Sequence, residues 1–163
     1  MRFRIDAEPS DDAWTEAAET RRREPPGSEY DRARQPLFDL LHADLQITHD
    51  GSQLFPAGPR SERPGYSISL LDLVLGLDEA VRRLDGPAVF SQADDALQLT
   101  FEPGNGTVLV STNLDRSPVL EVPRDDLFAE WRRFRDAFLA ELRERAPELL
   151  EWHTLAPLRQ HDL

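Results

Sequence analysis

The chain has 163 residues, with 31 acidic side chains, 19 basic side chains and a formal net charge of −12. This length fits one domain, so we expect residues 1–163 to form a single domain. The basic side chains are all arginines and cysteine is absent, which excludes disulfides, thiolate metal sites and a cysteine nucleophile.

The negative charge also limits the classes of partner. An acidic surface repels phosphate backbones, so we predict no nucleic-acid partner and favour a protein partner with a basic surface. The chain has no run of about 18 apolar residues and no apolar signal-peptide core, which predicts no membrane contact and a cytoplasmic location. Arginine without lysine, together with 13 prolines, is typical of proteins from high-GC bacteria.

The chain begins with a predicted strand and a short helix. Apolar residues occupy alternate positions over residues 2–7, the pattern of a strand with one buried face. Ser10 precedes Asp11 and Asp12, which suits an N-cap followed by acids in the first helical turn. We expect the helix to end near Arg23.

A hairpin is predicted between two irregular segments. Proline, glycine and charged residues make 24–37 and 56–65 loops. Between them, alternating apolar residues over 41–48 predict a strand, and Asp50-Gly51 is a strong signal for a tight turn because both positions tolerate positive φ. A short return strand follows at 53–55.

A helix is predicted over residues 69–84. Ser69 can cap its N-terminus, with Asp72 three positions later. Apolar residues recur at spacings of three and four and mark a buried face. Asp78 and Arg82 are one helical turn apart, and we expect them to pair on the solvent side.

Four short strands and a long helix complete the chain. The strands are expected at residues 89–90, 97–102, 108–112 and 119–122, joined by tight turns into an antiparallel meander. The helix runs from Asp125 to about Ala146, and a short helix follows from Pro147. The buried stripe of the long helix contains Leu127, Trp131, Phe134, Phe138 and Leu142.

These elements indicate an α+β fold. We predict two layers, in which a curved, mainly antiparallel sheet of about six strands is covered by two or three helices, with a long C-terminal helix.

No catalytic motif emerges from the sequence, and we lean away from an enzyme. Gly104-Asn105-Gly106 follows a strand but precedes another strand, so it lacks the helix N-terminus of a phosphate-binding loop. His42 and Asp44 share one face of a strand and are weak metal-ligand candidates, with His49 as a third. Solvent-facing polar residues explain the same pattern, so we predict no metal and no cofactor.

Acidic clusters are the candidate partner-binding surface. An aromatic side chain beside acids suits a protein interface, since aromatic residues anchor the contact and charge steers the approach. The alternative for the aromatic residue is burial under the C-terminal tail. The candidates are Asp11, Asp12, Asp94, Asp95, Glu148, Glu151 and Trp152.

The segment from Ser69 to Pro147 resembles small immunity-type proteins that are encoded beside polymorphic toxins in high-GC bacteria. The resemblance rests on LLDLVLGLDEAVRRL, the short strands ALQLTFEP and TVLVSTN, and the closing VPRDDLFAEWRRFRDAFLAEL. It covers about half of the chain and concerns layout and hydrophobic placement. It implies neutralisation of a toxin by occlusion, without catalysis, and no site residues carry over.

We therefore expect a non-enzymatic protein-binding module, immunity-like, that neutralises a basic partner. A second hypothesis is a small-molecule-binding or hydrolytic domain with a pocket between the sheet and the loops 24–37 and 56–65. A third is a homo-oligomeric accessory protein, such as a homodimer joined through an exposed sheet edge.

Overall fold

A computed structural model describes residues 1–23, 40–55, 66–92 and 96–160. Within these ranges the protein is α+β, with two antiparallel sheets of four strands each and a long helix near the C-terminus. No helix among the described residues is both long and apolar enough to cross a membrane.

The first sheet is built around β2, which pairs with every other strand of that sheet. β1 lies along one edge of β2, and β3 and β4 pair with different parts of its other edge. The strands are β1 (Arg2–Ala7), β2 (His42–His49), β3 (Ser52–Gln53) and β4 (Tyr66–Ser69).

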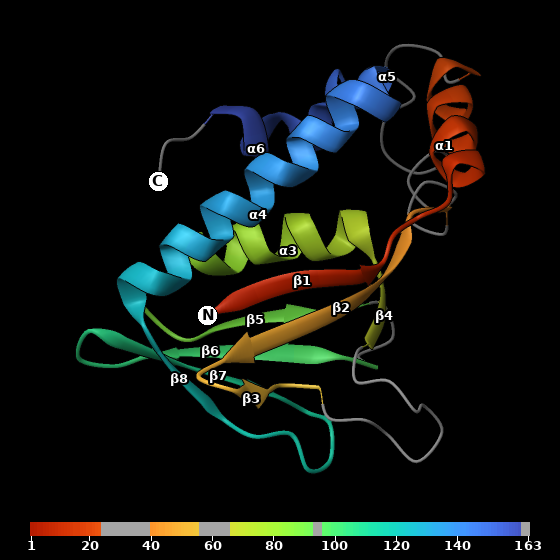
Figure 1. The fold of residues 1–163 in the computed structure, drawn as a ribbon. Helices are drawn as coiled ribbons and strands as arrows, with labels where there is room; N and C mark the ends of the chain where they lie inside the picture. The colour runs from red at the N-terminus through yellow and green to blue at the C-terminus, as the bar shows by residue number, and fades with distance from the viewer. Residues whose placement is uncertain (24–39, 56–65, 93–95, 161–163) are drawn as a thin grey trace.

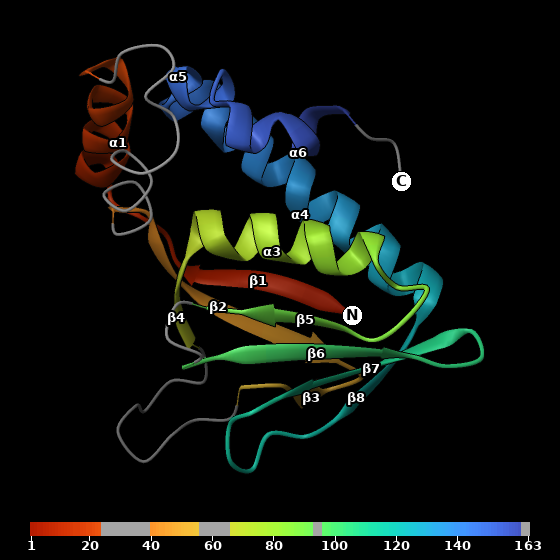
Figure 2. The ribbon, with the colours of Figure 1, turned by 180° about the vertical axis from the view of Figure 1, so that it is seen from behind.

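The second sheet is a meander in which each strand pairs antiparallel with the next, in chain order. In Figure 1 β2 lies nearer the viewer than β6, and in the reverse view of Figure 2 the order is exchanged. The strands are β5 (Ala88–Ser91), β6 (Gln98–Pro103), β7 (Thr107–Thr112) and β8 (Leu120–Pro123).

The two longest central helices lie on one side of both sheets. α3 lies next to the strands and α4 crosses above it, while α1 stands beside α5 at one end (Figures 1 and 2). The helices are α1 (Asp11–Arg23), α3 (Leu70–Arg82), α4 (Arg124–Arg145), α5 (Pro147–Leu150) and α6 (Ala156–Gln160), with a 3₁₀ turn at His153–Leu155.

Several local predictions are confirmed. The side chain of Ser69 accepts a hydrogen bond from the backbone N–H of Asp72 at 3.3 Å and caps α3. Ser10 caps α1 in the same way, through the N–H of Ala13 at 3.2 Å. The turn between β2 and β3 has positive φ at both Asp50 and Gly51, 48° and 79°.

One hydrophobic cluster joins both sheets and all the long helices. The predicted stripe of α4 is buried along its whole length, and α3 is buried on more than one side. Phe3 of β1 packs on Phe134 of α4, with ring centroids 5.6 Å apart. Helix α4 therefore covers the free edge of β1 as well as the core.

Three predictions need correction. The strands form two sheets, not one sheet of about six strands, because β1 and β2 pair with each other rather than with the meander. The strand β4 was not predicted, since Tyr66–Ser69 is too short to show an alternation. Asp78 is only 3% exposed, although we placed it on the solvent side. Its partner Arg82 also donates to the carbonyl of Pro157, so the C-terminal segment covers this side of α3.

Candidate functional site

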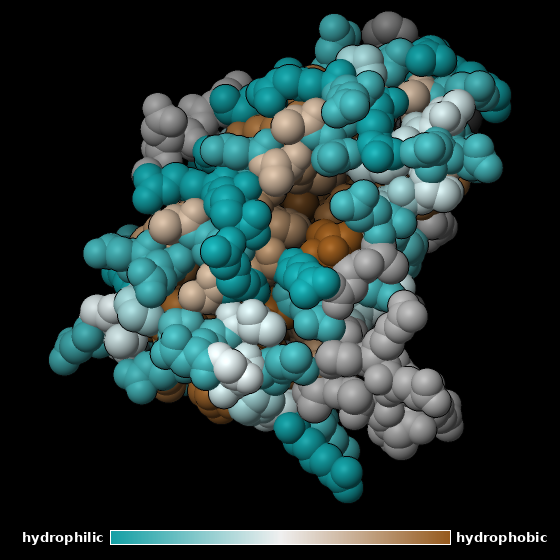
Figure 3. Space-filling view, in the orientation of Figure 1, coloured by the Kyte–Doolittle hydropathy of each residue, from teal (hydrophilic) through white to brown (hydrophobic). Residues whose placement is uncertain are grey.

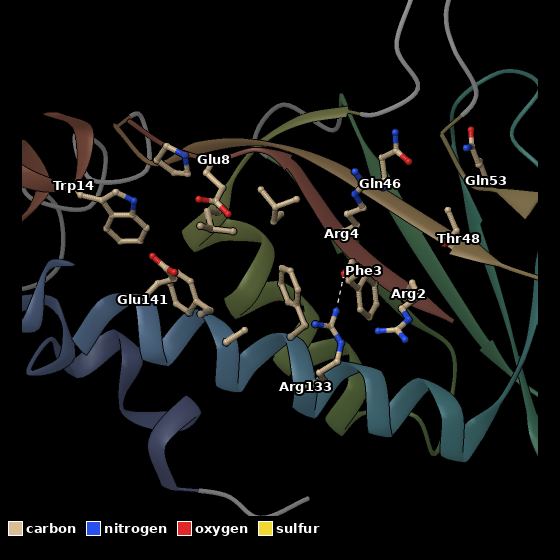
Figure 4. A pocket seen from close by; sticks show the side chains of 16 residues that line it. Arg2, Phe3, Arg4, Glu8, Trp14, Gln46, Thr48, Gln53, Arg133 and Glu141 are labelled. Carbon is tan, nitrogen blue, oxygen red and sulfur yellow. Dashed lines mark hydrogen bonds between the residues drawn. The ribbon is translucent and has the colours of Figure 1, made fainter. Parts of the chain in front are cut away.

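A cavity of about 680 Å³ lies between β1 and α4. In Figure 3 apolar atoms lie recessed at the centre of this face, bordered by hydrophilic side chains. Figure 4 shows the residues that line the cavity. They are Arg2, Phe3, Arg4, Ile5, Glu8, Pro9, Trp14, Gln46, Thr48, Gln53, Leu70, Arg133, Phe134, Ala137, Phe138 and Glu141.

The α4 wall of the cavity follows one face of the helix. Arg133, Ala137 and Glu141 recur every four residues, and that spacing places them above one another along the axis. Phe134 and Phe138 stand beside them and supply apolar surface, while Ala137 is exposed. A rise of about 1.5 Å per residue separates the backbones of Arg133 and Glu141 by about 12 Å.

The β1 wall is attached to α4 by a polar clasp. The backbone N–H of Phe3 donates to Oε1 of Glu130 at 2.7 Å, and Arg133 donates to the carbonyl oxygen of Phe3 at 2.8 Å. Arg133 also donates two hydrogen bonds to the Glu130 carboxylate, at 2.6 and 2.8 Å. Both outward backbone groups of Phe3 are thus satisfied at an edge of the sheet where β1 has no neighbouring strand among the described residues.

The hydrogen bonds of the clasp keep the Glu130 carboxyl ionised. Burial alone would raise the pKa of this carboxyl, but hydrogen bonds from Arg133 and from the Phe3 N–H, with the charges of Arg133 and Arg2, bring it below its ordinary value. The pKa of Arg133 is raised in turn by its hydrogen bond to Glu130. The pair is therefore ionised at neutral pH.

Basic side chains gather at the clasp end of the cavity. Arg2 lies near Arg133, across the cavity from the acidic end, whereas Arg4 projects beside Gln46 on the other side of β1 (Figure 4). Arg2 pairs in register with Thr48 of β2, and Arg4 pairs with Gln46. The charges of Arg2 and Arg133 both act on the Glu130 carboxylate at this end.

Acidic side chains gather at the opposite end. Glu8 and Glu141 lie near the indole of Trp14, which is 3% exposed (Figure 4). Glu141 accepts a hydrogen bond from Arg145 at 2.7 Å, and Arg145 also pairs with Asp11. Along both walls the basic residues come first in the chain and the acidic residue follows. On β1 the order is Arg2 and then Glu8, and on α4 it is Arg133 and then Glu141. The cavity is therefore polar at both ends, with opposite sign, and apolar between them.

No family model, no curated protein and no solved structure matches the chain.

The structure brings two of the predicted acidic clusters to the same end of the molecule. Asp11 pairs with Arg145 at the end of α4, and Glu148 of α5 pairs with Arg22 of α1 at 2.6 Å. The pKa of Glu148 is lowered, first by a hydrogen bond from its own backbone and then by Arg22. The two clusters contain four acids, Asp11, Asp12, Glu148 and Glu151. Asp11 and Glu148 form ion pairs within the protein.

The remaining partner-binding candidates divide into three groups. Asp12 and Glu151 are exposed and available to a partner. Asp94 and Asp95 lie outside the described residues. Trp152 is 1% exposed, so the prediction that it anchors a partner at the surface is wrong, and the alternative of burial under the tail holds. The following residues Leu155 and Leu158 dock the C-terminal segment and are buried with it.

The three metal-ligand candidates are not brought together. His42 and Asp44 are exposed on the outer face of β2. His49 is at the other end of β2, seven residues from His42, and an odd number of steps along a strand places the two side chains on opposite faces. At about 3.3 Å per residue, the backbones of His42 and His49 are roughly 23 Å apart. Its Nε2 lies 3.5 Å from Oδ2 of Asp50. These residues cannot share one metal ion.

Sequence reasoning missed the residues that line the cavity. Arg2 and Arg4 occupy alternate positions on β1 in a strongly acidic chain, and this was the one local signal available. Arg133 and Glu141 looked like ordinary solvent-facing residues of α4. Only the pairing of β1 with β2 and its attachment to α4 place these four side chains around one space.

Proposed function

We propose that this chain is a binding protein for a small, predominantly apolar molecule that enters the cavity between β1 and α4. The observation that carries the proposal is the cavity itself. Its volume of about 680 Å³ lies within the range of about 300–1,000 Å³ common for ligand sites. Its floor is apolar, as is usual in such sites, and eight of its sixteen lining residues are polar or charged.

The chemistry of the floor supports an apolar ligand. Phe134, Phe138 and Trp14 are aromatic side chains that are almost fully buried, yet each borders the cavity. A ligand gains about 25 cal/mol for each Å² of apolar surface that it removes from water. The three rings offer little of this surface, and the more exposed Ile5 and Ala137 offer more. This location differs from the pocket expected between the sheet and the segments 24–37 and 56–65, which lie outside the described residues.

Dye binding with a plugged cavity tests the proposal. Anilinonaphthalene sulfonate should bind the wild-type protein with enhanced fluorescence at a stoichiometry of one. Ala137→Trp fills the space from an exposed position of α4, so it should abolish the enhancement without lowering stability. Ala140→Trp is the matched control, because Ala140 is exposed on the same helix and does not line the cavity. Equal dye binding by the two variants would refute the site.

A separate observation supports a second function, recognition of a basic protein. The net charge is −12, and Asp12, Glu16 and Glu151 are exposed on α1 and just after α5, two helices that an ion pair joins. Charged groups of this kind steer a partner of opposite charge. We propose on this ground, and on the immunity-type resemblance, that the α1–α5 end occludes a toxin with a basic surface.

This second proposal is tested with proteins encoded next to the gene. The expected result is a complex with a basic neighbour, whose association rate falls with added salt. Combining Asp12→Asn, Glu16→Gln and Glu151→Gln should slow association, whereas Ala137→Trp should not. If no neighbouring product binds, the occlusion proposal fails and the cavity proposal stands unaffected.

A further inference from the structure

We propose that the outer face of the second sheet, formed by β5, β6, β7 and β8, is a docking surface for a protein with a basic surface. The partner would contribute an apolar side chain that covers Leu109 and cationic side chains that reach Glu102 and Glu121. This inference goes beyond both proposed functions, because it uses neither the cavity nor the α1–α5 end.

The outer face of this sheet is accessible among the described residues. Alternate residues of each strand are buried and face the core, and the residues between them point outward. Figure 2 views the sheet from this side, and no described helix lies in front of β6 and β7. A protein partner can therefore approach the strands directly.

Exposed apolar side chains are concentrated on this face. Among the described residues, the exposed large hydrophobic side chains are Val89 at 57%, Leu109 at 37% and Val119 at 61%. Val89 and Leu109 point outward from β5 and β7. Val119 directly precedes the buried Leu120 of β8, so the alternation of an extended chain places it on the outer side too.

The outer face of the first sheet differs from this one. Its outward residues on β1 and β2 whose side chains the structure describes are arginine, histidine, aspartate, glutamine and threonine. Single exposed apolar residues are common on proteins, whereas a group of them with a polar border marks an interaction surface. Their concentration on one sheet therefore distinguishes the second sheet as the interface.

The strand register places Leu109 between two carboxylates. Leu109 pairs with Glu102 of β6 on one side and with Glu121 of β8 on the other, and all three side chains are exposed. Neighbouring strands lie about 4.8 Å apart, so the backbones of the two glutamates are about 10 Å apart. The row across these three strands therefore has the order acid, apolar, acid.

Cations of the sheet do not balance this negative charge. The four strands contain no arginine, lysine or histidine, and Glu102 and Glu121 have no ion pair with another described residue. The helices differ, since Glu19, Glu79 and Glu141 each pair with an arginine one turn later. Cationic side chains of a partner would supply the counter-charges that the sheet lacks.

The same charges argue against a second copy of this chain as the occupant. Two copies docked face to face would bring Glu102 and Glu121 of one copy near the same carboxylates of the other. Such contacts between like charges are unfavourable, and each copy has a net charge of −12. A basic partner instead places opposite charges at both glutamates.

The size of the face suits a transient contact. The longer strands of the sheet have 6 residues. Four strands about 4.8 Å apart, with a rise of about 3.3 Å per residue, give a face of roughly 400 Å². This is about half of the roughly 800 Å² that each partner buries in a standard interface. We therefore expect fast exchange, which NMR titration detects.

NMR titration with two synthetic peptides tests the proposal. In the first peptide lysine and leucine alternate, and the second has serine at each leucine position and the same charge. The first peptide should shift the backbone amide signals of Val89, Leu109 and Glu121. It should also bind about threefold or more tightly than the second peptide, because only leucine removes apolar surface from water. Added salt should weaken the binding of both peptides.

Two kinds of substitution separate the apolar and charged parts of the face. Leu109→Thr keeps a residue that suits a strand, so it should weaken binding of the first peptide about threefold or more and leave the second unchanged. Glu102→Gln combined with Glu121→Gln should weaken both peptides about threefold or more. Asp12→Asn combined with Glu16→Gln is the matched control, since it removes the same charge from exposed positions of α1. The control should leave both affinities unchanged.

A second apolar variant guards against a change in folding. Val89→Thr alters a side chain that is 57% exposed and keeps its shape, so it should not lower the thermal unfolding midpoint. It should weaken the first peptide in the same direction as Leu109→Thr. If neither substitution alters the affinity of the first peptide, the apolar part of the proposal is wrong.

The remaining outcomes would overturn the proposal in different ways. Equal binding of the two peptides, or an equal effect of the control and the outer-face pair, would mean that the peptides respond to overall charge. Shifts confined to α1 and α5 would support the second proposed function instead. If the wild-type protein sediments as a dimer that Leu109→Thr dissociates, the face joins two copies of the chain. Each of these results leaves the cavity proposal to its own test by dye binding.

Discussion

The backbone N–H of Phe3 donates a 2.7 Å hydrogen bond to Oε1 of Glu130, a residue 127 positions later in the chain. This bond joins the first strand to the long helix and closes one end of the cavity. Glu130 is 6% exposed and is held as a carboxylate by Arg133, so the wall of the site depends on a buried ion.

Glu130→Gln should lower the free energy of unfolding by about 1–2 kcal/mol at neutral pH. The amide oxygen can still accept from Phe3, but the charge that faces Arg133 is lost. Urea unfolding monitored by tryptophan fluorescence measures the change. Glu144→Gln, an exposed substitution on the same helix, should leave stability within about 0.5 kcal/mol of wild type.

The same variant should change the dependence of stability on pH. The pKa of Glu130 is lower in the folded protein than its ordinary value of 4.5, so the unfolded state binds more protons as the pH falls. The stabilisation is present above pH 4.5 and is lost as the pH falls through the lower, folded-state pKa. The difference in stability between wild type and Glu130→Gln should therefore shrink below pH 4.5. A constant difference across that range would contradict the assignment.

Gly76→Ala should destabilise the protein by about 1–2 kcal/mol. A Cβ at Gly76 of α3 would lie 2.0 Å from Cδ2 of Phe90 on β5, and the Phe90 ring is 4% exposed and cannot turn outward freely. Overpacking costs about 1–3 kcal/mol, and the better helix propensity of alanine offsets part of it. Gly86→Ala is the control, because an added Cβ there meets no atom within 4 Å.

Trp152→Ala should cost about 3–5 kcal/mol in thermal or urea unfolding, the range for removing a buried tryptophan. Asp12→Ala, on the exposed face of α1, should change stability by less than about 0.5 kcal/mol. The reverse ranking would mean that Trp152 is a surface residue after all.

Gly51→Ala should destabilise the hairpin between β2 and β3 by about 1–2 kcal/mol. Gly51 has φ of 79°, a left-handed conformation that places the Cβ of an L-residue against its own carbonyl. A Cβ at Gly51 would meet no other atom within 4 Å, so the cost comes from the backbone conformation and not from a steric clash with a neighbour. Unfolding midpoints of Gly51→Ala and Gly86→Ala compared side by side provide the measurement, and an equal effect in both would exclude the turn strain.

Local chemistry let the sequence determine most elements. The Ser69 cap, the Asp50-Gly51 turn and the aromatic stripe of α4 depend on residues within a few positions of each other, so alternation, spacing and turn chemistry locate them. Composition likewise determined the acidic charge and the absence of disulfides.

Tertiary structure alone decided which of these elements share a space. The pairing of β1 with β2, the cover of Asp78 by the C-terminal segment and the burial of Trp152 all join residues that are distant in sequence. Periodicity reports which face of an element is apolar but not which neighbour that face meets, because the same apolar stripe fits several partners. The cavity forms only when β1 pairs with β2 and is attached to α4. This arrangement places Arg2 and Glu8 on one wall and Arg133 and Glu141 on the other.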